Sequence, residues 1–247
     1  MSSVQSVYGL HAVQALLARR PDRIVAVRLA ESRDDPRVRR IEELARQHGV
    51  SLQRVDSRAL KHLLGDVAHQ GVVADVRPLP PWTEDDLLEA LTRATAPLLL
   101  ALDGVQDPHN LGACLRTADA CGALAVIVPK DRAAQLTPTV RKVAAGAAET
   151  TPVVAVTNLV RSLKLLKDAG IWIVGADAEA PKLAQELDLR GPLALVLGAE
   201  GFGLRRLTRE TCDAIVRLPQ LGSVESLNVS VAAGMLLYEA VRQRLTV

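Results

Sequence analysis

Residues Leu193–Arg244 decide the fold, and they read LALVLGAEGFGLRRLTRETCDAIVRLPQLGSVESLNVSVAAGMLLYEAVRQR. Two apolar runs in this stretch, Leu193–Leu197 and Ala214–Leu218, have the length of buried strands. Each is followed by an unusual loop, Gly198–Gly203 after the first and Pro219–Asn228 after the second. In open parallel α/β sheets, ligands bind at loops that follow the carboxyl ends of strands. Both loops are therefore candidate parts of a binding site.

The rest of the second half repeats this alternation of short apolar strands with helices. Strands are predicted at Leu98–Leu102, Ala125–Val128, Val153–Val156 and Ile171–Ala176, and helices at Leu111–Cys121, at Leu159–Lys167 and from Leu204. A final helix places Leu227, Val231, Met235 and Tyr238 on one face. Alternating strands and helices predict an α/β fold with a mainly parallel sheet covered on both faces.

The first part of the chain reads as a smaller α/β unit over residues 1–77. Its predicted strands are Ile24–Leu29, Leu52–Val55 and Gly71–Val76. Its predicted helices are Gly9–Arg19, Pro36–His48 and Ser57–Leu64, the last with its serine as the cap. Three prolines within Pro78–Trp82 cannot continue a helix or a central strand, so this stretch is predicted to be a semi-rigid linker. With the acidic helix Thr83–Ala94, the linker spans residues 78–95 and leaves residues 96–247 as the second domain.

The composition restricts the kinds of partner. Aromatic residues are only 2% of the 247 residues, which argues against a nucleic-acid binder built on aromatic stacking platforms. Residues 1–77 hold 13 Lys and Arg against 9 Asp and Glu, and all but one of these cations are Arg. Arginine suits bidentate contact with phosphate, although a charged solvated surface is an equal interpretation of the charge alone.

The sequence also indicates a compartment. The three cysteines, Cys114, Cys121 and Cys212, show no C-x-x-C spacing, which is typical of reduced intracellular thiols, and we expect each to have a structural role. The first residues contain no apolar secretory region, and no apolar run is long enough to span a membrane. We expect a cytoplasmic protein with no membrane partner and no metal.

The loop after Leu98–Leu102 carries two candidate residues, each with a simpler interpretation. Asn110 stands where a helix N-cap belongs, so it is either a cap or part of a site. Arg116 lies near the second turn of the next helix, where it either serves a site or forms a surface ion pair. A catalytic role for His109 is less favoured than a structural or exposed position.

The other two loops add polar and apolar candidates. Gly198–Gly203 is G-x-x-G-x-G rather than the dinucleotide fingerprint G-x-G-x-x-G. Glu200 within it either belongs to a site or answers a helix dipole. In the last loop, Ser226 and Asn228 beside Leu218 and Leu227 either hold a ligand or cap the final helix, with Ser226 as the cap.

Together the three loops resemble a known set of motifs. The order Asp-Pro-x-Asn-x-Gly-x-x-x-Arg, Leu-Gly-x-Glu-Gly-x-Gly, Leu-Pro-x-x-Gly-x-x-x-Ser-Leu-Asn over residues 98–247 resembles the SpoU (TrmH) branch of the SPOUT methyltransferase superfamily. Tyr8–Val13 and His69–Val72 are similar to the ends of the accessory domain of ribosomal-protein L30e type found in that branch. The whole chain most resembles members that methylate guanosine riboses in 23S ribosomal RNA.

The resemblance implies a deep trefoil knot in the second domain and a homodimer with the site near its interface. It implies that S-adenosylmethionine binds near Gly198, Leu218 and Leu227, and that an RNA ribose 2′-hydroxyl is methylated. The catalytic set carried over is Asn110, Arg116, Glu200, Ser226 and Asn228. Because a guanidinium is a poor base, we expect Arg116 to clamp the adjacent phosphate and stabilise the developing alkoxide.

Other functions remain open from the sequence. A transfer-RNA ribose methyltransferase is the nearest alternative, although such relatives typically lack the accessory domain. An inactive RNA-binding relative is disfavoured by the intact Asn110, Arg116, Glu200 and Asn228, and a Rossmann dehydrogenase by the missing fingerprint. Glu225 departs from the family pattern, which usually has a small hydroxyl residue there.

Overall fold

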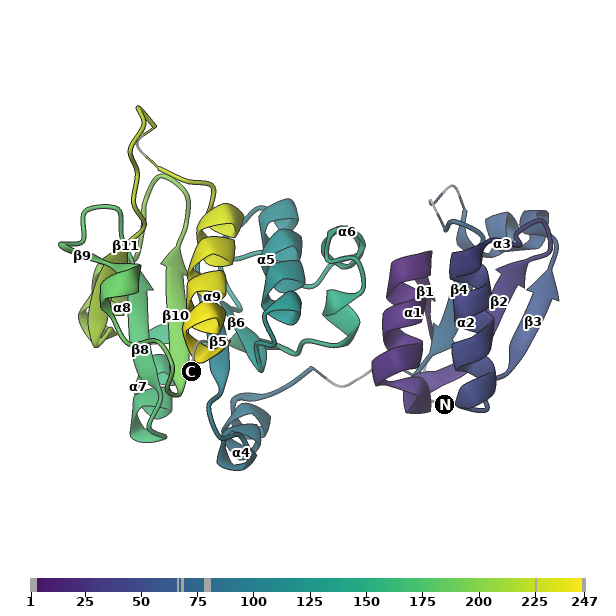
Figure 1. Ribbon diagram of the computed structural model, residues 1–247, viewed down its shortest axis with the longest axis horizontal. Helices are drawn as coiled ribbons and strands as arrows, with labels where there is room; N and C mark the ends of the chain where they lie inside the picture. The colour runs from purple at the N-terminus through teal and green to yellow at the C-terminus, as the bar shows by residue number, and fades with distance from the viewer. Residues whose placement is uncertain (1–3, 66, 68, 78–80, 225, 246–247) are drawn as a thin grey trace. The chain divides into compact units, whose positions relative to one another are not determined.

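The computed structural model describes residues 4–65, 67, 69–77, 81–224 and 226–245. The chain divides into two compact units (Figure 1). The first contains residues 1–80 together with 145–150, and the second contains residues 81–144 and 151–247. The predicted linker falls partly on residues 78–80, and the departure at Glu225 falls on residue 225, all of which lie outside the described residues.

The first unit is built on a mixed four-stranded sheet in the order β1-β4-β2-β3. Its strands are β1 (Gln5–Tyr8), β2 (Ile24–Ala30), β3 (Leu52–Val55) and β4 (Val72–Val76). The edge strand β1, which the sequence analysis missed, pairs antiparallel with β4. Apolar residues from α1 (Leu10–Arg19) and α2 (Pro36–Gln47) pack on one face of the sheet. Leu60 of α3 (Ser57–Leu64) packs in a smaller cluster with Ala30 and Val73.

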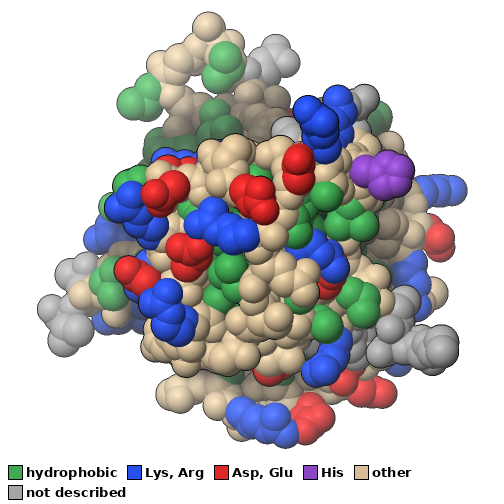
Figure 2. All heavy atoms as spheres, turned by 90° about the vertical axis from the view of Figure 1, so that its right-hand side faces the viewer, with side chains coloured by type: hydrophobic (Ala, Val, Ile, Leu, Met, Phe, Trp, Pro, Cys, Tyr) green, Lys and Arg blue, Asp and Glu red, His purple; other side chains and the backbone are tan. Residues whose placement is uncertain are grey.

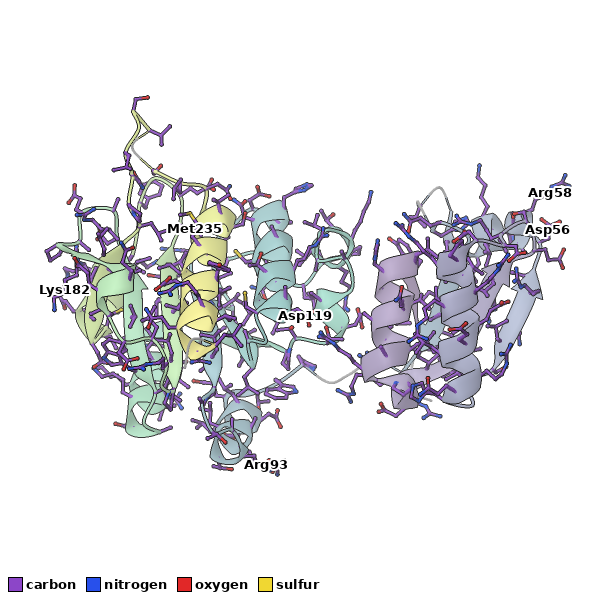
Figure 3. The ribbon with its side chains drawn as sticks, in the orientation of Figure 1. Asp56, Arg58, Arg93, Asp119, Lys182 and Met235 are labelled. Atoms are coloured by element: carbon purple, nitrogen blue, oxygen red, sulfur yellow. The ribbon has the colours of Figure 1, made fainter. Side chains whose placement is uncertain are left out.

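Aspartates fix where two of these helices begin. Asp35 accepts from the backbone N–H groups of Arg37 and Val38, and Pro36 occupies the first helical position, where its missing N–H costs nothing. Asp56, rather than the expected Ser57, caps α3 by accepting from the Arg58 N–H at 2.7 Å; Figure 3 labels both residues. Asp is at least as good a cap as Ser, which accounts for the difference.

Most of the arginines of the first unit lie beside acidic partners. On the face shown in Figure 2, Lys and Arg side chains are interspersed with Asp and Glu. The ion pairs include Arg20–Asp22, Arg28–Asp75, Arg33–Asp35, Arg39–Asp34, Arg40–Glu43 and Arg54–Glu42. Few arginines of residues 1–77 therefore contribute positive charge that no acidic neighbour offsets. Among the described residues, the side chains of Arg37, Arg46 and Arg58 make no ion pair.

A short segment from the middle of the chain completes the first unit. Residues 145–150 include a 3-10 turn, Ala147–Glu149, in which Glu149 is buried. Arg23 donates to the Glu149 carbonyl at 3.1 Å and to its carboxylate at 3.4 Å, and it also donates to the Arg77 carbonyl at 3.1 Å. Gly146 has φ +99, and a Cβ there would lie 2.9 Å from the Ala12 Cα. No sequence pattern indicated this arrangement.

The second unit confirms the predicted fold class. Its seven-stranded sheet has the order β7-β6-β5-β10-β8-β11-β9, and every recorded pairing in it is parallel. The strands are β5 (Leu98–Asp103), β6 (Ala125–Pro129), β7 (Val153–Val156), β8 (Trp172–Ala176), β9 (Lys182–Leu183), β10 (Leu193–Gly198) and β11 (Ala214–Arg217). Continuous apolar runs such as LLLA in β5 suit a sheet that is buried on both faces.

Helices cover both faces of this sheet. Alternate strand residues such as Leu99 and Val196 pack with leucines of α4 (Glu84–Arg93) and α7 (Leu159–Asp168). On the other face, α5 (Pro108–Ala120) lies beside α9 (Val229–Leu245), as Figure 1 shows. Two short helices complete the unit, α8 (Arg206–Thr211) and α6 (Pro138–Val143), and α6 was not predicted.

The final helix buries a different face from the one that its sequence pattern marks. Val229, Ala233, Leu236, Leu237 and Ala240 of α9 are buried. Val231, Met235 and Tyr238, which share the predicted apolar face, are 50%, 39% and 65% exposed; Figure 3 labels Met235. Both sides of α9 are apolar, so periodicity alone could not tell which side faces the sheet. The trefoil knot implied by the resemblance stays a prediction.

Candidate functional site

Two of the three loops start from neighbouring strands. β5 and β10 pair in parallel, and the last residues of the two strands, Asp103 and Gly198, are partners in the register. The chain leaves β5 towards β6 and β7 on one side, while β8 lies on the other side of β10. Such a reversal of strand order is where open α/β sheets form a ligand crevice. Sheet topology thus places the loops of Asn110 and Glu200 side by side.

The third loop reaches the same place from further away. It leaves β11, which is separated from β10 by β8, and it enters α9, which packs against α5 and β10. The chain must therefore return from β11 towards β5 and β10 before α9 begins. This return delivers Asn228, the residue before α9, to the first two loops.

Asn110, Glu200 and Asn228 form one hydrogen-bonded cluster, which we call the amide–carboxylate cluster. The Glu200 Oε1 atom accepts from Asn110 Nδ2 at 3.1 Å and from Asn228 Nδ2 at 2.6 Å. Asn228 Nδ2 also donates to Asn110 Oδ1 at 2.9 Å. Each residue comes from a different loop, so the cluster ties the three loops together at one point.

Glu200 also satisfies the start of the last helix. Its Oε1 atom accepts from the backbone N–H of Val229, the first residue of α9, at 3.2 Å. Asn228 Oδ1 accepts from the backbone N–H and the hydroxyl of Ser230 at 2.9 and 2.6 Å, so Asn228, not Ser226, occupies the capping position. Glu200 therefore interacts with a helix N-terminus, as one of its two interpretations proposed. The helix is α9, however, and not α8, which follows the loop of Glu200 in the sequence.

Asn110 is not the cap that its position suggested. Asp107 caps α5 by accepting from the His109 N–H at 2.8 Å, and Pro108 takes the first helical position. Asn110 lies inside the first turn and is 9% exposed. Its amide is therefore free of capping and available to the cluster.

The Gly198–Gly203 loop closes on itself. Ala199 and Gly203 form an isolated antiparallel bridge, and the Ala199 carbonyl accepts from the Gly203 N–H at 2.9 Å. A Cβ on Gly198 would lie 2.0 Å from the carbonyl carbon and oxygen of Gly203. The close approach that requires glycine here is made by the protein's own backbone.

The third loop presents its backbone to solvent. Among the described residues, no backbone–backbone hydrogen bond involves 218–224 or 226–227. Leu218 and Leu227 are half-buried, Leu221 is 99% exposed and Ser226 is exposed. Free peptide groups beside leucine side chains can bind a ligand that has both hydrogen-bonding edges and flat apolar faces.

Arg116 is the predicted site residue that lies apart. It follows Asn110 by six helical positions, which is roughly 240° around the axis and 9 Å along it. Its side chain is exposed and makes no hydrogen bond or ion pair to any part of the chain that the structure describes. Within one copy it therefore faces away from the cluster. The surface ion pair considered as its simpler role is not formed.

A buried carboxylate that the sequence analysis did not single out joins the start of the first loop to the end of the second. It is Asp103, the last residue of β5, and it contacts Arg205, which follows the Gly198–Gly203 loop. Asp103 accepts from the Arg205 backbone N–H at 2.9 Å, and the Arg205 guanidinium lies 3.4 Å from its second oxygen. Gly104, at φ +85, leaves room for that guanidinium, because a Cβ there would lie 2.9 Å from it. The sequence does contain a signal for this role. Asp103 is the only charged residue of the apolar strand β5, it stands at the end of the strand, and glycine follows it.

Cys114 lies on the buried side of α5. Burial, with a smaller contribution from the nearby Glu200 charge, raises the pKa of its thiol to about 12. Burial likewise raises the pKa of Cys212 to about 12. These thiols are neutral packing groups, in agreement with the structural role expected for them.

Two hollows open at this end of the sheet. The smaller, of about 210 Å³, adjoins the cluster and is lined by Gly104–Asp107, Asn110, Ala199, Glu200, Phe202 and Val229. The larger, of about 350 Å³, lies among Asp103, Arg132, Asn158 and Arg205, and none of the predicted site residues lines it. We place the site at the smaller hollow, because the candidate side chains converge there.

The described residues show neither a metal-binding group nor a membrane-spanning helix. Over the described ranges, no group of three His, Cys, Asp or Glu residues is placed to hold a metal ion. None of the helices in those ranges has both the length and the apolar character needed to cross a membrane.

Comparison with known proteins identifies the family. The model of the SpoU rRNA Methylase family matches residues 97–238, and that for RNA 2'-O ribose methyltransferase substrate binding matches residues 6–82. Proteins named 23S rRNA (guanosine-2'-O-)-methyltransferase RlmB are 58% identical in Pseudomonas aeruginosa and 53% identical in Coxiella burnetii, each over 99% of this chain and 98% of the relative.

Solved structures agree with this assignment. The SpoU methyltransferase AviRb from Streptomyces viridochromogenes, in complex with the cofactor AdoMet, has a TM-score of 0.75 at 27% identity and covers 99% of this chain and 92% of its own. The A. aeolicus TrmH/SpoU tRNA modifying enzyme has a TM-score of 0.56 at 30% identity and covers 65% of this chain and 84% of its own. The chain belongs to the SpoU rRNA methylase family.

Proposed function

We propose that this protein is an enzyme that transfers a methyl group from S-adenosylmethionine to the ribose 2′-hydroxyl of a guanosine in 23S ribosomal RNA. The observation that carries the proposal is the near full-length similarity to relatives named for that activity, over both the methylase and the substrate-binding regions. A transfer-RNA substrate is less well supported, because similarity to the tRNA modifying enzyme extends over 65% of this chain.

The second and third loops fit S-adenosylmethionine. The cofactor combines a hydrogen-bonding adenine edge with flat apolar faces, which suits the free backbone of residues 218–224 and 226–227 beside Leu218 and Leu227. Gly198 keeps the facing loop in its closed shape. When bound, the cofactor supplies a methyl group on a sulfonium, whose departure as a neutral thioether needs little further help.

The chain's own residues then position the ribose. Glu200 holds the Asn110 and Asn228 amides through one oxygen, so these amides are oriented before the substrate arrives. Arg116, permanently charged, clamps a phosphate beside the reacting hydroxyl and stabilises the alkoxide as its proton leaves. Ser226, exposed in the third loop, supplies a hydroxyl to the same pocket.

A second copy of the chain completes the enzyme. Val231, Met235 and Tyr238 form an apolar stripe on α9 that the single copy leaves exposed. Arg116 on the neighbouring helix α5 has no polar partner among the described residues. A homodimer through this surface would bury the stripe and bring Arg116 towards the partner's site.

Residues 1–77 select the RNA. Arginines with no acidic partner among the described residues, such as Arg46 and Arg58, are available for phosphate contacts. The low aromatic content favours recognition of RNA shape and backbone. Because the proposed substrate is ribosomal RNA, we place the enzyme in the cytoplasm.

Two experiments test the activity. Addition of S-adenosylmethionine should raise the melting temperature of the protein, whereas NAD should not. Ribose methylation should then be mapped across ribosomal RNA from a strain that lacks this gene. We expect one guanosine of 23S RNA to lose its 2′-O-methyl group and to regain it when the gene is restored. An unchanged map would refute the proposal.

A further inference from the structure

The hollow beside the amide–carboxylate cluster carries chemistry that the methyl transfer itself does not use. Any nucleotide whose 2′-hydroxyl reacts at the cluster must place its base next to it, because the base is attached to the neighbouring ribose carbon. The hollow of about 210 Å³ shares Asn110 and Glu200 with the cluster. Its other lining residues include Phe202, Asp107 and Gln106, which have no part in the catalytic and cofactor-binding roles proposed above.

Phe202 forms an exposed aromatic wall. It is the single phenylalanine of the chain, and it is 91% exposed. It stands between Gly201 at φ +78 and Gly203 at φ +62, and the Ala199 carbonyl accepts from its N–H at 3.3 Å. A hydrogen-bonded turn with a glycine on each side thus presents the ring to solvent at the rim of the site. Exposed aromatic rings beside RNA sites stack on unpaired bases.

Asp107 and Gln106 supply hydrogen-bonding groups to the same hollow. Asp107 uses Oδ1 to cap α5, and within the part of the chain that the structure describes its Oδ2 has no partner. The exposed Gln106 side chain likewise makes no hydrogen bond to the described residues. The pair offers one carboxylate acceptor and one amide that can donate and accept.

We propose that this hollow binds the guanine base of the target nucleotide, stacked on Phe202 and read by Asp107 and Gln106. Guanine presents N1–H and N2–H donors beside the O6 acceptor on its Watson–Crick edge. Asp107 Oδ2 accepts from the two donors, and the Gln106 amide donates to O6. Adenine places a ring-nitrogen acceptor where guanine has N1–H, so it would face the carboxylate with repulsion. The inference rests on the proposed function, since it concerns the nucleotide that is methylated.

Asp107→Asn is the sharpest test of base reading. Asparagine retains the cap of α5, because its Oδ1 can still accept from the His109 N–H, but it replaces the free acceptor by a donor. The substrates are two fragments of 23S RNA that differ only in having guanosine or inosine, which lacks the 2-amino group, at the mapped position. We expect the wild type to prefer guanosine, and the variant to lose about 10- to 100-fold in kcat/KM on guanosine and to treat the two alike.

Phe202 variants test the stacking. Phe202→Ala should lower kcat/KM by about 5- to 100-fold, mainly through KM, and Phe202→Trp should keep it near the wild-type value. Binding of S-adenosylmethionine, the melting temperature and the oligomeric state should stay unchanged in all three variants.

Two results would overturn the base assignment. One is an Asp107→Asn enzyme that still prefers guanosine over inosine, and the other is a Phe202→Ala protein that changes from dimer to monomer, which would assign the ring to a partner copy. Both differ from failure of the proposed function, in which the wild type itself would not methylate guanosine in 23S RNA.

Discussion

At the scale of single residues, we propose that Glu200 and Arg116 have separate roles, Glu200 in ordering the site and Arg116 in acting on the substrate. Glu200 gathers the Asn110 and Asn228 amides and the Val229 N–H on one oxygen, so it orders the three loops before RNA binds. Arg116 is exposed and unengaged among the described residues, as expected for a side chain that acts on a substrate.

Replacing Arg116 should affect turnover and not cofactor binding. Arg116→Ala removes one preorganised charge-stabilising donor and should lower single-turnover methyl transfer by on the order of 10²–10³. Arg116→Lys should recover only part of this, because a point charge cannot reproduce the planar fork. Calorimetry with S-adenosylmethionine should give the wild-type affinity for both variants. A wild-type rate for Arg116→Ala would mean that another residue has this role.

Cys114 and Cys212 should be inert in the native protein. With the pKa of Cys114 and Cys212 raised to about 12, the thiolate fraction at pH 8 is on the order of 10⁻⁴ for each. The sign follows from burial, which disfavours the charged form; labelling should therefore speed up only as pH rises towards 12. A chromogenic disulfide reagent should label neither residue at pH 8, whereas the denatured protein should show all three thiols. Rapid native labelling of Cys114 would contradict its burial.

At the scale of loops and helices, the site depends on how tightly the second loop closes. Gly198 has no room for a side chain, since a Cβ would lie 2.0 Å from the Gly203 backbone. The Asp103–Arg205 contacts hold the far end of this loop against β5. The loop is therefore a rigid support for Glu200.

Gly198→Ala should open that loop. The methyl group must push Gly203 away, so we expect a loss of stability of about 1–3 kcal/mol, together with a loss of S-adenosylmethionine binding. Gly191→Ala, just before β10 and outside the three loops, is the matched control, because a Cβ there meets nothing within 4 Å. Denaturant unfolding and calorimetry on both variants provide the comparison. If Gly198→Ala binds the cofactor normally, the loop does not need its closed form.

At the scale of the whole molecule, we propose two partner surfaces: the α9 stripe for a second copy, and the arginines of the first unit that make no ion pair among the described residues for RNA. The stripe consists of apolar side chains that the single copy exposes. The arginines are distinguished from their neighbours by having no acidic partner among the described residues.

Met235→Glu should turn the proposed homodimer into a monomer. The side chain is 39% exposed in one copy, so a carboxylate there is tolerated by the fold but not by an apolar interface. Leu63→Glu, at an apolar residue that is 51% exposed on α3, is the control and should leave the mass unchanged. Light scattering after size-exclusion chromatography measures the molar mass of each variant. A dimeric Met235→Glu protein would mean that the interface lies elsewhere.

RNA affinity should depend on which arginines are removed, and not only on how many. Arg46→Gln/Arg58→Gln removes two cations that make no ion pair with any described residue. Arg39→Gln/Arg40→Gln removes two that are paired with Asp34 and Glu43. The net charge changes equally. The first pair should weaken binding and lower the slope of affinity against salt by about 1 per lost phosphate contact, whereas the second should do neither. If both double variants weaken RNA binding equally, the arginines form only a solvated charged surface and make no specific phosphate contacts.

These paired substitutions are preferable to deleting the first unit. Removing residues 1–82 would also remove Arg23 and so would break its buried ion pair with Glu149. A truncated protein could lose activity for that reason alone.

The sequence by itself determined the α/β class, most strand and helix positions and the three loops, because these follow from local periodicity and from glycine and proline. Only the tertiary structure decided which candidates meet. Asn110 can join the cluster because α5 begins at Pro108 and Asp107 is its cap. Asn228 reaches Glu200 because the chain returns from β11 to the start of α9. The exposed face of α9 and the packing of residues 145–150 on the first unit likewise depend on contacts between segments distant in sequence, which no local pattern records.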